Sequence, residues 1–271
     1  MFKNYTPTVL TIAGSDPYGG AGIQIDCKTI HALGGYAFSV ITALTAQNST
    51  GVKSLQSTNH EMFRQQLETL LEDVKPNAVK IGMLANIELI EIVIEMIKKY
   101  ELKNIVLDTV LISSSGKKLL DEDAIEIMIK KLFPLADIIT PNIPEINTFL
   151  KCNYIGEEDE VEEIAKDFMK LGVNSVLIKG GHSNDQENAI DYLVSKDLEV
   201  HTFTTPRVNT IHTHGTGCLL SSAIATNLAL ALDLQESVKE AKNFLYEKLR
   251  YSTTLNLNHK DEKQERREPI F

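Results

Sequence analysis

Short runs of apolar residues alternate along the chain with longer stretches in which apolar residues recur every three or four positions. The short runs are rich in β-branched residues and are apolar throughout, which is typical of strands buried on both faces of a sheet. Such strands are predicted at residues 9–13, 37–42, 78–81, 104–108, 137–140 and 175–179. This pattern predicts an α/β protein with a mostly parallel sheet between two layers of helices, a three-layer α/β/α fold.

Helical periodicity follows several of these strands. Apolar residues spaced by three and four positions predict two amphipathic helices, one through Ile87, Ile90, Ile94 and Ile97 and one through Ile125, Met128, Ile129 and Leu132. After residue 179, two short strand-like runs at 189–194 and 198–203 indicate a hairpin at one edge of the sheet, and helices are expected at 217–232 and 235–255. No linker or internal repeat divides the chain, so we predict one domain over residues 1–258 and a charged, solvated tail over 259–271.

Charge and cysteine content narrow the class of protein. The 27 Lys and Arg residues are outnumbered by 37 Asp and Glu residues, which gives a net charge of −10 and argues against a nucleic-acid-binding protein. Three widely spaced cysteines form no C-x-x-C pair, so neither a disulfide framework nor a thiolate zinc site is expected. The apolar segment at 219–234 is too short and too polar to span a membrane. We expect a cytoplasmic protein without a nucleic-acid or membrane partner.

Polar residues follow the predicted strands where a ligand site is expected in a parallel sheet. Asp108, Asn142 and Glu145 offer oxygen donors suited to Mg²⁺, and Lys179 is suited to a phosphate. Each of these residues has an alternative interpretation as a helix cap, a turn cap or a solvated charge. Asp26 and Gln47 follow the first two strands and are suited to hydrogen bonds with a polar ring, although each is also an ordinary surface residue type.

A glycine-rich segment, THGTGC at 213–218, opens the predicted helix at 217–232. It matches neither a P-loop nor a dinucleotide-binding fingerprint. Backbone N–H groups of Gly215, Thr216, Gly217 and Cys218 at a helix N-terminus favour an anion, while the alternative is a glycine turn into a packed helix. The helix terminus is expected to lower the pKa of Cys218 and make it a base or nucleophile. His212 and His214 have no third zinc ligand at a recognisable spacing, so in preference to a zinc site we interpret them as loop histidines or as histidines that support a ligand-binding residue.

Seven segments, taken in order, resemble the hydroxymethylpyrimidine/phosphomethylpyrimidine kinase family of the ribokinase-like superfamily. They are GSDPYGGAGIQIDCKT, ITALTAQNSTGV, KIGMLAN, VLDTVLISSSGKKLL, TPNIPE, VLIKGGH and THGTGC, and the resemblance covers residues 9–255. It implies a ribokinase-like fold, a homodimer and an ATP- and Mg²⁺-dependent kinase of thiamine biosynthesis. Its substrates would be 4-amino-5-hydroxymethyl-2-methylpyrimidine and the monophosphate of that compound.

The resemblance also implies a role for individual residues. Cys218 stands where the superfamily usually has an aspartate base, and Gly215, Thr216 and Gly217 would form the anion hole. Asn142 and Glu145 would organise Mg²⁺ and the ATP phosphates next to Lys179, and Asp108 joins Glu145 as a candidate metal ligand. The pyrimidine pocket would be formed by Gly14, Asp26, Gln47, Met83 and Val110, and residues 113–118 match a flap over the site.

This chain departs from the family pattern in two places. Ile211 and Leu219 stand where members usually have Lys and Thr, so the nucleotide contacts of those two residues do not transfer. The usual glycine-rich ending that contains Pro-Val is replaced by the charged tail.

Two other functions remain open from the sequence. A pyridoxal or pyridoxine kinase also acts on a hydroxymethyl group of a nitrogen heteroaromatic ring and would use the same Gln47 and Asp26. A cysteine in the flap would favour pyridoxal, but Ser113, Ser114 and Ser115 stand there. A non-catalytic vitamin-binding module is the third possibility, and the intact anion loop and Glu145 argue against it.

Overall fold

The computed structural model describes residues 6–111, 120–182, 185, 187–252 and 269–270. Within this part of the chain the strands form one sheet of nine, in the order β3-β2-β1-β4-β5-β6-β7-β8-β9. The six strands from β2 to β7 in that order are parallel, while β3 at one edge and β8 and β9 at the other are antiparallel. Their bounds are β1 Thr8–Ser15, β2 Tyr36–Asn48, β3 Gly51–Ser57, β4 Ala78–Ile81, β5 Ile105–Leu107, β6 Ile138–Ile139, β7 Ser175–Lys179, β8 Asn188–Ser195 and β9 Val200–Pro206.

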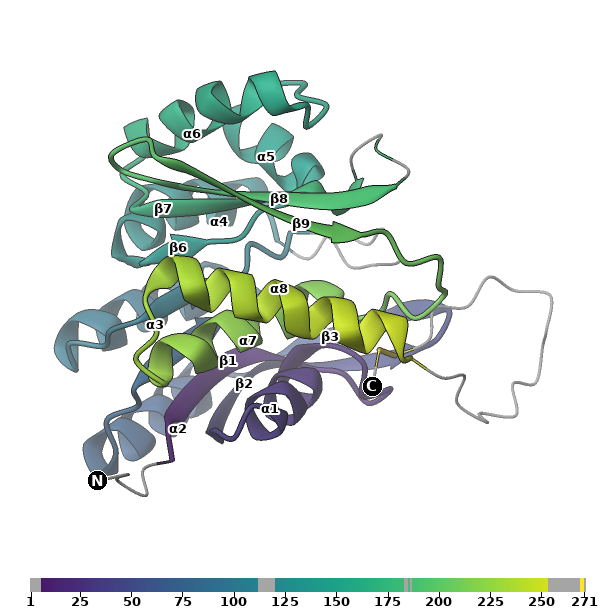
Figure 1. Cartoon of the computed structure of the whole chain (residues 1–271). Coiled ribbons are helices and arrows are strands. Elements are labelled where there is room, and N and C mark those ends of the chain that lie inside the picture. The colour runs from purple at the N-terminus through teal and green to yellow at the C-terminus, as the bar shows by residue number, and fades with distance from the viewer. Residues whose placement is uncertain (1–5, 112–119, 183–184, 186, 253–268, 271) are drawn as a thin grey trace, which may run out of the picture.

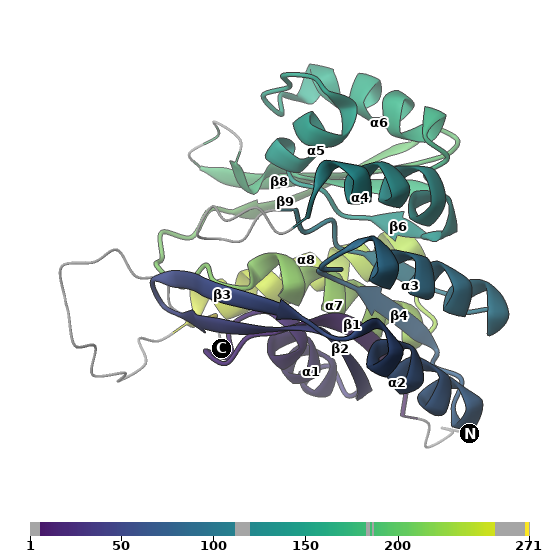
Figure 2. The ribbon, with the colours of Figure 1, turned by 180° about the vertical axis from the view of Figure 1, so that it is seen from behind.

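Helices cover both faces of this sheet. Helices α1, α7 and α8 lie on the face toward the viewer in Figure 1, and α2 to α6 lie on the opposite face, seen in Figure 2. The predicted mostly parallel, three-layer arrangement is therefore confirmed. The bounds are α1 Gly22–Ala32, α2 His60–Asp73, α3 Ile87–Lys99, α4 Glu122–Ile127, α5 Ile143–Leu150, α6 Val161–Lys170, α7 Thr216–Ala229 and α8 Leu234–Arg250.

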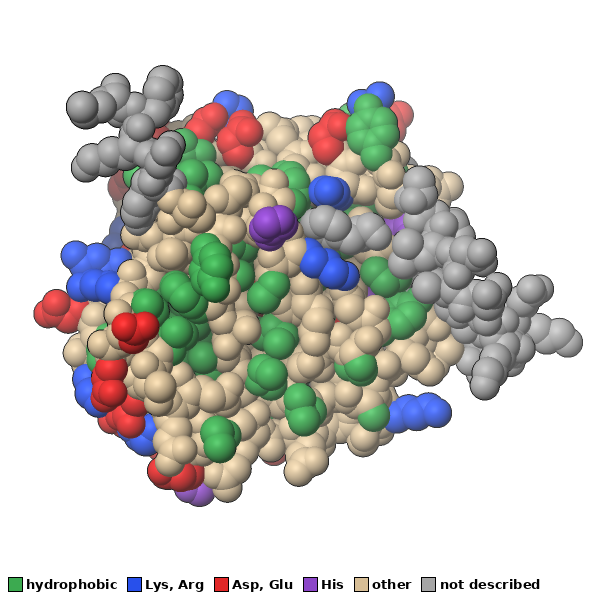
Figure 3. Space-filling model, turned by 90° about the horizontal axis from the view of Figure 1, so that it is seen from below, with side chains coloured by type: hydrophobic (Ala, Val, Ile, Leu, Met, Phe, Trp, Pro, Cys, Tyr) green, Lys and Arg blue, Asp and Glu red, His purple; other side chains and the backbone are tan. Residues whose placement is uncertain are grey.

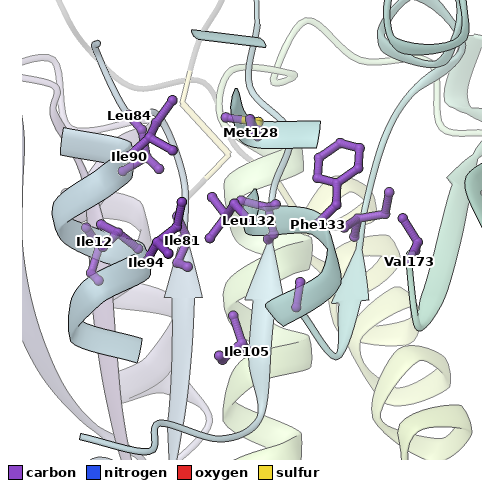
Figure 4. Packing of buried hydrophobic residues seen from close by; sticks show 14 of the residues in the cluster. Ile12, Ile81, Leu84, Ile90, Ile94, Ile105, Met128, Leu132, Phe133 and Val173 are labelled. Carbon is purple, nitrogen blue, oxygen red and sulfur yellow. The ribbon is translucent and has the colours of Figure 1, made fainter. Parts of the chain in front are cut away.

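Each central strand contributes side chains to two separate cores. Ile81 and Ile105 pack with α3 and the segment after α4, as Figure 4 shows, while Ala78 and Val106 pack on the other face with α7 and α8. All four residues are at most 2% exposed. Burial on both faces explains why these strands are continuous apolar runs in the sequence.

The sequence pattern did not predict the edge strand β3. Its sequence, GVKSLQS, is largely polar, and none of its residues is buried, so it lacks the apolar signal of the central strands. It pairs with the second half of β2, which continues to Asn48 instead of ending near residue 42 as predicted. Backbone pairing at the sheet edge therefore decides this hairpin, because β3 has no buried side chain to anchor it.

The predicted solvated tail is wrong at residues 269 and 270. Pro269 forms a bridge with His214, and Ile270 is 1% exposed in a cluster with Ile25 and Leu219. The remainder of the tail, like the predicted flap at 113–118, lies outside the described residues. No helix in the described part of the chain is long and apolar enough to cross a membrane. The division into a domain at 1–258 and a tail at 259–271 stays a prediction.

Candidate active site

The carboxyl ends of the parallel strands bring the predicted polar residues to one edge of the sheet. Asp108 directly follows β5 and Lys179 ends β7, and the Nζ of Lys179 lies 3.3 Å from Oδ1 of Asp108. The start of α7 reaches the same place: a Cβ built on Gly217 would lie 3.7 Å from Nζ of Lys179 and 3.8 Å from Oδ2 of Asp108. The structure thus unites three predicted site residues that are far apart in the sequence.

The first turn of α7 is shaped by Gly215. This residue caps the helix with a φ of +88°, a left-handed conformation that favours glycine. Space is also limiting, because a Cβ at this position would lie 1.7 Å from the carbonyl oxygen of Gly20. The next residues begin a helix, whose first N–H groups have no partner within the helix itself. The predicted anion-binding turn therefore has the backbone geometry that such a site requires.

Asp108 is held in its charged form. Burial by itself would raise the pKa of this carboxyl, but the charges of Lys179 and Lys80 and hydrogen bonds from Lys179 and Ser221 lower it below its usual value. The hydroxyl of Ser221 on α7 donates to Oδ2 at 3.2 Å, and that of Thr140 lies 3.3 Å from Oδ1. A buried, ionised carboxylate beside a lysine is the expected arrangement at a site for charged ligands.

Asn142 and Glu145 form a capping box at the start of α5. The side chain of Asn142 accepts from the N–H of Glu145, and a Glu145 oxygen accepts from the N–H of Asn142, each at 2.9 Å. The hydroxyl of Thr109 also donates to Glu145 at 3.0 Å. Burial raises the pKa of Glu145 to about 6, with Asp108 adding to the rise and Lys179 opposing it. Its carboxyl therefore lies in a site where further positive charge would be favourable.

The donor set at this edge fits Mg²⁺ bound together with a phosphate ligand. Asp108 and Glu145 supply two carboxylates close enough to influence each other's charge. Among the described residues there is no group of three or more His, Cys, Asp and Glu side chains that could enclose a metal ion. Mg²⁺ typically uses only one or two protein carboxylates and takes its remaining ligands from water and substrate phosphates.

Cys218 differs from its prediction. It lies at the N-terminus of α7, as expected, but burial raises the pKa of its thiol to about 11, although the charge of Lys80 lowers it. The expectation that the helix terminus lowers this pKa is wrong, because loss of solvent around the thiolate outweighs the helix dipole. The residue as a whole is nonetheless half-buried.

Gly14 and Met83 lie together at the end of β1. A Cβ built on Gly14 would lie 2.6 Å from Cε of Met83, and the hydroxyl of Thr42 on β2 donates to the Met83 carbonyl at 2.7 Å. Val110 is two residues beyond Asp108 and is half-buried, with its N–H bonded to the Asp108 carbonyl. The predicted contact of these three residues with a ring stays a prediction.

Gln47 belongs to a polar chain that the sequence did not predict. The Nε2 of His214 lies 3.3 Å from Nε2 of Gln47 and 2.8 Å from Oδ2 of Asp16, and both His214 and Asp16 are buried. Asp16 in turn accepts from the N–H groups of Tyr18, Gly20 and Ala21. His214, which the sequence indicated as a loop histidine or as support for a ligand-binding residue, therefore links β2 to the loop after β1.

Asp26 lies beneath the site instead of on its surface. Its carboxylate is fully buried and is paired with Nζ of the fully buried Lys80 at 2.8 and 2.9 Å. Ser222 on α7 donates to it at 2.7 Å, and Thr11 on β1 also donates. Its predicted contact with a polar ring stays a prediction, whereas its role in joining four elements is part of the fold. Lys80 carried no signal in the sequence, because it lies within an apolar strand 54 positions away.

The two residues that depart from the family pattern differ in their exposure to solvent. Ile211 is 57% exposed, and Leu219 is completely buried in the cluster with Ile25 and Ile270. Leu219 therefore acts in packing, while the position of Ile211 leaves its side chain in solvent.

Comparison with known proteins decides the family. The family model of phosphomethylpyrimidine kinase matches residues 16–263. The hydroxymethylpyrimidine/phosphomethylpyrimidine kinase of Escherichia coli (strain K12) is 42% identical over 250 residues, which are 92% of this chain and 93% of that protein. The chain belongs to the phosphomethylpyrimidine kinase family.

Solved structures agree with this membership and with a ribokinase-like fold. The phosphomethylpyrimidine kinase of Clostridium difficile 630 superposes with a TM-score of 0.78 at 42% identity, covering 89% of this chain and 99% of that one. The pyridoxal kinase of Bacillus subtilis, solved with ADP, gives a TM-score of 0.85 at 30% identity, covering 93% and 95%. The Staphylococcus aureus pyridoxal kinase with AMP-PCP and pyridoxal gives 0.84 at 29% identity, covering 93% and 91%. This chain therefore shares its fold with pyridoxal kinases, but it is less similar to them in sequence than to the phosphomethylpyrimidine kinases.

Proposed function

We propose that this chain uses ATP to phosphorylate the hydroxymethyl group of 4-amino-5-hydroxymethyl-2-methylpyrimidine and then the resulting monophosphate, in thiamine biosynthesis. The observation that carries the proposal is the 42% identity with a kinase of that name over 92% of the chain. The shared edge formed by Asp108, Lys179 and the start of α7 supports it, because this edge suits a phosphate-bearing ligand. We also propose a cytoplasmic location.

The anion-binding turn and Lys179 supply the electrostatic part of the mechanism. Phosphoryl transfer passes through a loose transition state whose negative charge lies on the equatorial oxygens, so positioned positive charge contributes most to the rate. We assign this role to the ammonium of Lys179 and the N–H groups of Gly215, Thr216, Gly217 and Cys218. Mg²⁺ held by Asp108 and Glu145, with Asn142 fixing Glu145, would supply positive charge to the ATP phosphates.

We assign Cys218 as the group that accepts the proton of the substrate hydroxyl. As the substrate oxygen forms its bond to the γ-phosphorus and the bond to the ADP oxygen breaks, the hydroxyl proton passes to Sγ of Cys218. With a pKa of about 11 the thiol is mostly protonated at neutral pH, so the step uses the small thiolate fraction, which is a strong base. The charge of the buried Lys80 nearby favours the thiolate and partly offsets the loss of solvent.

Binding of the pyrimidine is assigned to the other end of the site. Gln47 offers an amide for hydrogen bonds with the ring, and Gly14, Met83 and Val110 would form the apolar walls. Asp26 lies beneath the site, paired with Lys80, whose charge acts on Cys218 and Asp108. The absence of a side chain at Gly14 leaves room beside Met83, whose Cε would lie only 2.6 Å from a Cβ at this position.

The assignment is tested with purified protein, Mg-ATP and three separate substrates: the pyrimidine, the pyrimidine monophosphate and pyridoxal. Product masses are followed with time. Conversion of both pyrimidine compounds, with pyridoxal much slower, is the expected result.

Pyridoxal kinase is the second candidate, because the TM-scores with pyridoxal kinases reach 0.85. Dominant formation of pyridoxal phosphate, with the pyrimidine monophosphate unchanged, would favour it. Tight pyrimidine binding without any ATP turnover would instead indicate a non-catalytic module.

We further propose a homodimer that uses the face of β2 and α2. Tyr36, Leu44 and Met62 are more than half exposed on this side, and apolar residues gathered on one face mark an interaction surface. An open groove of about 690 Å³ lies between the two elements. Figure 3, which views the molecule from below, shows hydrophobic side chains spread over the middle of one face with charged residues mainly around its rim. Such a surface suits a second copy of the chain.

A further inference from the structure

Residues 269 and 270 lie against the active site. Pro269 forms a parallel β-bridge with His214, which directly precedes the anion-binding turn. Ile270 is 1% exposed and packs in a cluster with Ile25 of α1 and Leu219 of α7. Residues near a chain terminus take a fixed position only where they contact the rest of the fold. The bridge of Pro269 and the packing of Ile270 supply such contacts beside the site.

Pro269 and the ring of His214 both lie against Gly20. A Cβ built on Gly20 would lie 2.3 Å from Cδ2 of His214 and 3.1 Å from Cβ of Pro269. The backbone of Gly20 therefore packs closely against both side chains. Because this layer admits no further atom, the imidazole of His214 has little freedom to rotate.

The ring orientation of His214 matters for the site. Its Nε2 is the atom that contacts Asp16 at 2.8 Å and Gln47 at 3.3 Å. A rotation of the ring would break the hydrogen bond with Asp16 and remove the neighbour of the Gln47 amide, whose oxygen also accepts from Thr45 at 3.4 Å. Ile270 acts on the same region from the other side, since Cys218 packs against the cluster of Ile25, Leu219 and Ile270.

We propose that Pro269 and Ile270 are positioning residues of the kinase site: they fix His214, and through it Gln47, and they support the first turn of α7. This inference rests on the proposed function and extends it to two residues whose side chains are apolar and take no part in the chemistry. Neither residue needs to touch a substrate, because each acts through a neighbour that the site uses. The structure thus assigns the segment at 269–270 a role in substrate orientation.

Steady-state kinetics test the proposal. Ile270→Asp, which places a charge in the cluster, and a truncation that removes residues 269–271 are expected to lower kcat/KM for the pyrimidine by roughly 10- to 100-fold. The KM for ATP is expected to change by less than about twofold, because Asn142, Glu145 and Lys179 lie on other elements. Ile270→Val should retain most of the activity. Ile155→Asp is the matched control, since Ile155 is 58% exposed.

Two kinetic outcomes would overturn the proposal. Unchanged kinetic constants in both variants would show that residues 269 and 270 have no influence on the site. A loss that affects both substrates equally, follows the loss of thermal stability and disappears at lower temperature would show a merely structural role.

A second readout does not depend on turnover. In a background with Cys27→Ser and Cys152→Ser, alkylation of Cys218 by iodoacetamide is measured in wild-type and Ile270→Asp chains. We expect the reaction to become at least about fivefold faster when the cluster opens, because access to the thiol controls the rate. Equal rates would overturn the proposal. If the wild-type chain phosphorylates neither pyrimidine compound but the rates still differ, the proposed function fails while the contact of residues 269 and 270 with the site stands.

Discussion

At the scale of single residues, the Glu145 carboxyl shows how burial changes the pKa of a side chain. Its pKa is raised from 4.5 to about 6, so the folded chain binds this proton more tightly than the unfolded chain does. The stabilisation from this proton is present below pH 4.5 and is lost as the pH rises through 6. Relative to Glu145→Gln, the wild-type free energy of unfolding should therefore fall by about 2 kcal/mol between acid and neutral pH.

Urea unfolding of both chains without Mg²⁺, at several pH values, measures this difference. Glu240→Gln, at an exposed position, serves as the control and should show no such trend. Glu145→Gln is also expected to lose Mg²⁺-dependent turnover, so the variant would be more stable and less active. A difference in unfolding free energy that does not change with pH would contradict the prediction.

Cys218 carries a second prediction at this scale. Cys218→Ala should keep ATP binding and lower kcat by roughly 10²- to 10⁴-fold, the usual contribution of a general base. Because its pKa is about 11, the wild-type kcat should rise with pH across the neutral and mildly alkaline range. Cys218→Asp, whose carboxylate is already ionised, should show a flatter profile. Near-normal turnover of Cys218→Ala would show that Cys218 is not the base.

At the scale of elements, the Lys80–Asp26 ion pair joins β4 to α1, with Thr11 of β1 and Ser222 of α7 bonded to the same carboxylate. Lys80→Met leaves a buried charge without its partner, so the free energy of unfolding should fall by about 3–5 kcal/mol. Adding Asp26→Asn removes that charge and should recover part of the loss. Lys99→Met breaks the exposed pair with Glu68 and should cost far less than loss of the buried pair, because solvent screens the two charges. Equal losses in the buried and exposed variants, measured by urea unfolding, would contradict this prediction.

The junction between α7 and the loop after β1 gives another prediction. Gly215→Ala would place a Cβ 1.7 Å from the Gly20 carbonyl oxygen, so the turn must move. We expect kcat/KM to fall at least about 100-fold, because displacement of a site by about 1 Å has effects of that size. Gly34 has a similar φ of +82°, but a Cβ built there would have no atom within 4 Å. Gly34→Ala should therefore cost only about 1–2 kcal/mol of stability and leave activity unchanged. Similar activity of the two variants would show that the close contact at Gly215 is not needed.

At the scale of the whole molecule, the exposed apolar face of β2 and α2 predicts self-association. Sedimentation equilibrium should give twice the 30.2 kDa mass of the chain. Met62→Glu adds a charge to this face and should yield a monomer, whereas Ile155→Glu, at an exposed residue away from it, should remain dimeric. A wild-type monomer at all concentrations would exclude the proposed interface.

The fold follows the sequence wherever burial is encoded locally. The apolar runs at β1, β4, β5, β6 and β7 predicted the parallel core, because strands buried on both faces must be apolar throughout. The polar edge strand β3 escaped prediction, since its pairing depends on the backbone of β2. The exit residues Asp108, Asn142, Glu145 and Lys179 were found from the rule that parallel strands place their carboxyl ends together.

The sequence by itself determined the layered fold, the family and the residues that meet at the strand ends, because each rests on a short pattern or an ordered set of motifs. The tertiary structure alone decided the contacts between distant segments: Asp26 with Lys80, Asp16 with His214, and Pro269 beside Gly20. It also decided the pKa of Cys218, which a helix terminus alone would lower. The physical reason is that desolvation and packing depend on every element surrounding a group, and no local spacing encodes them.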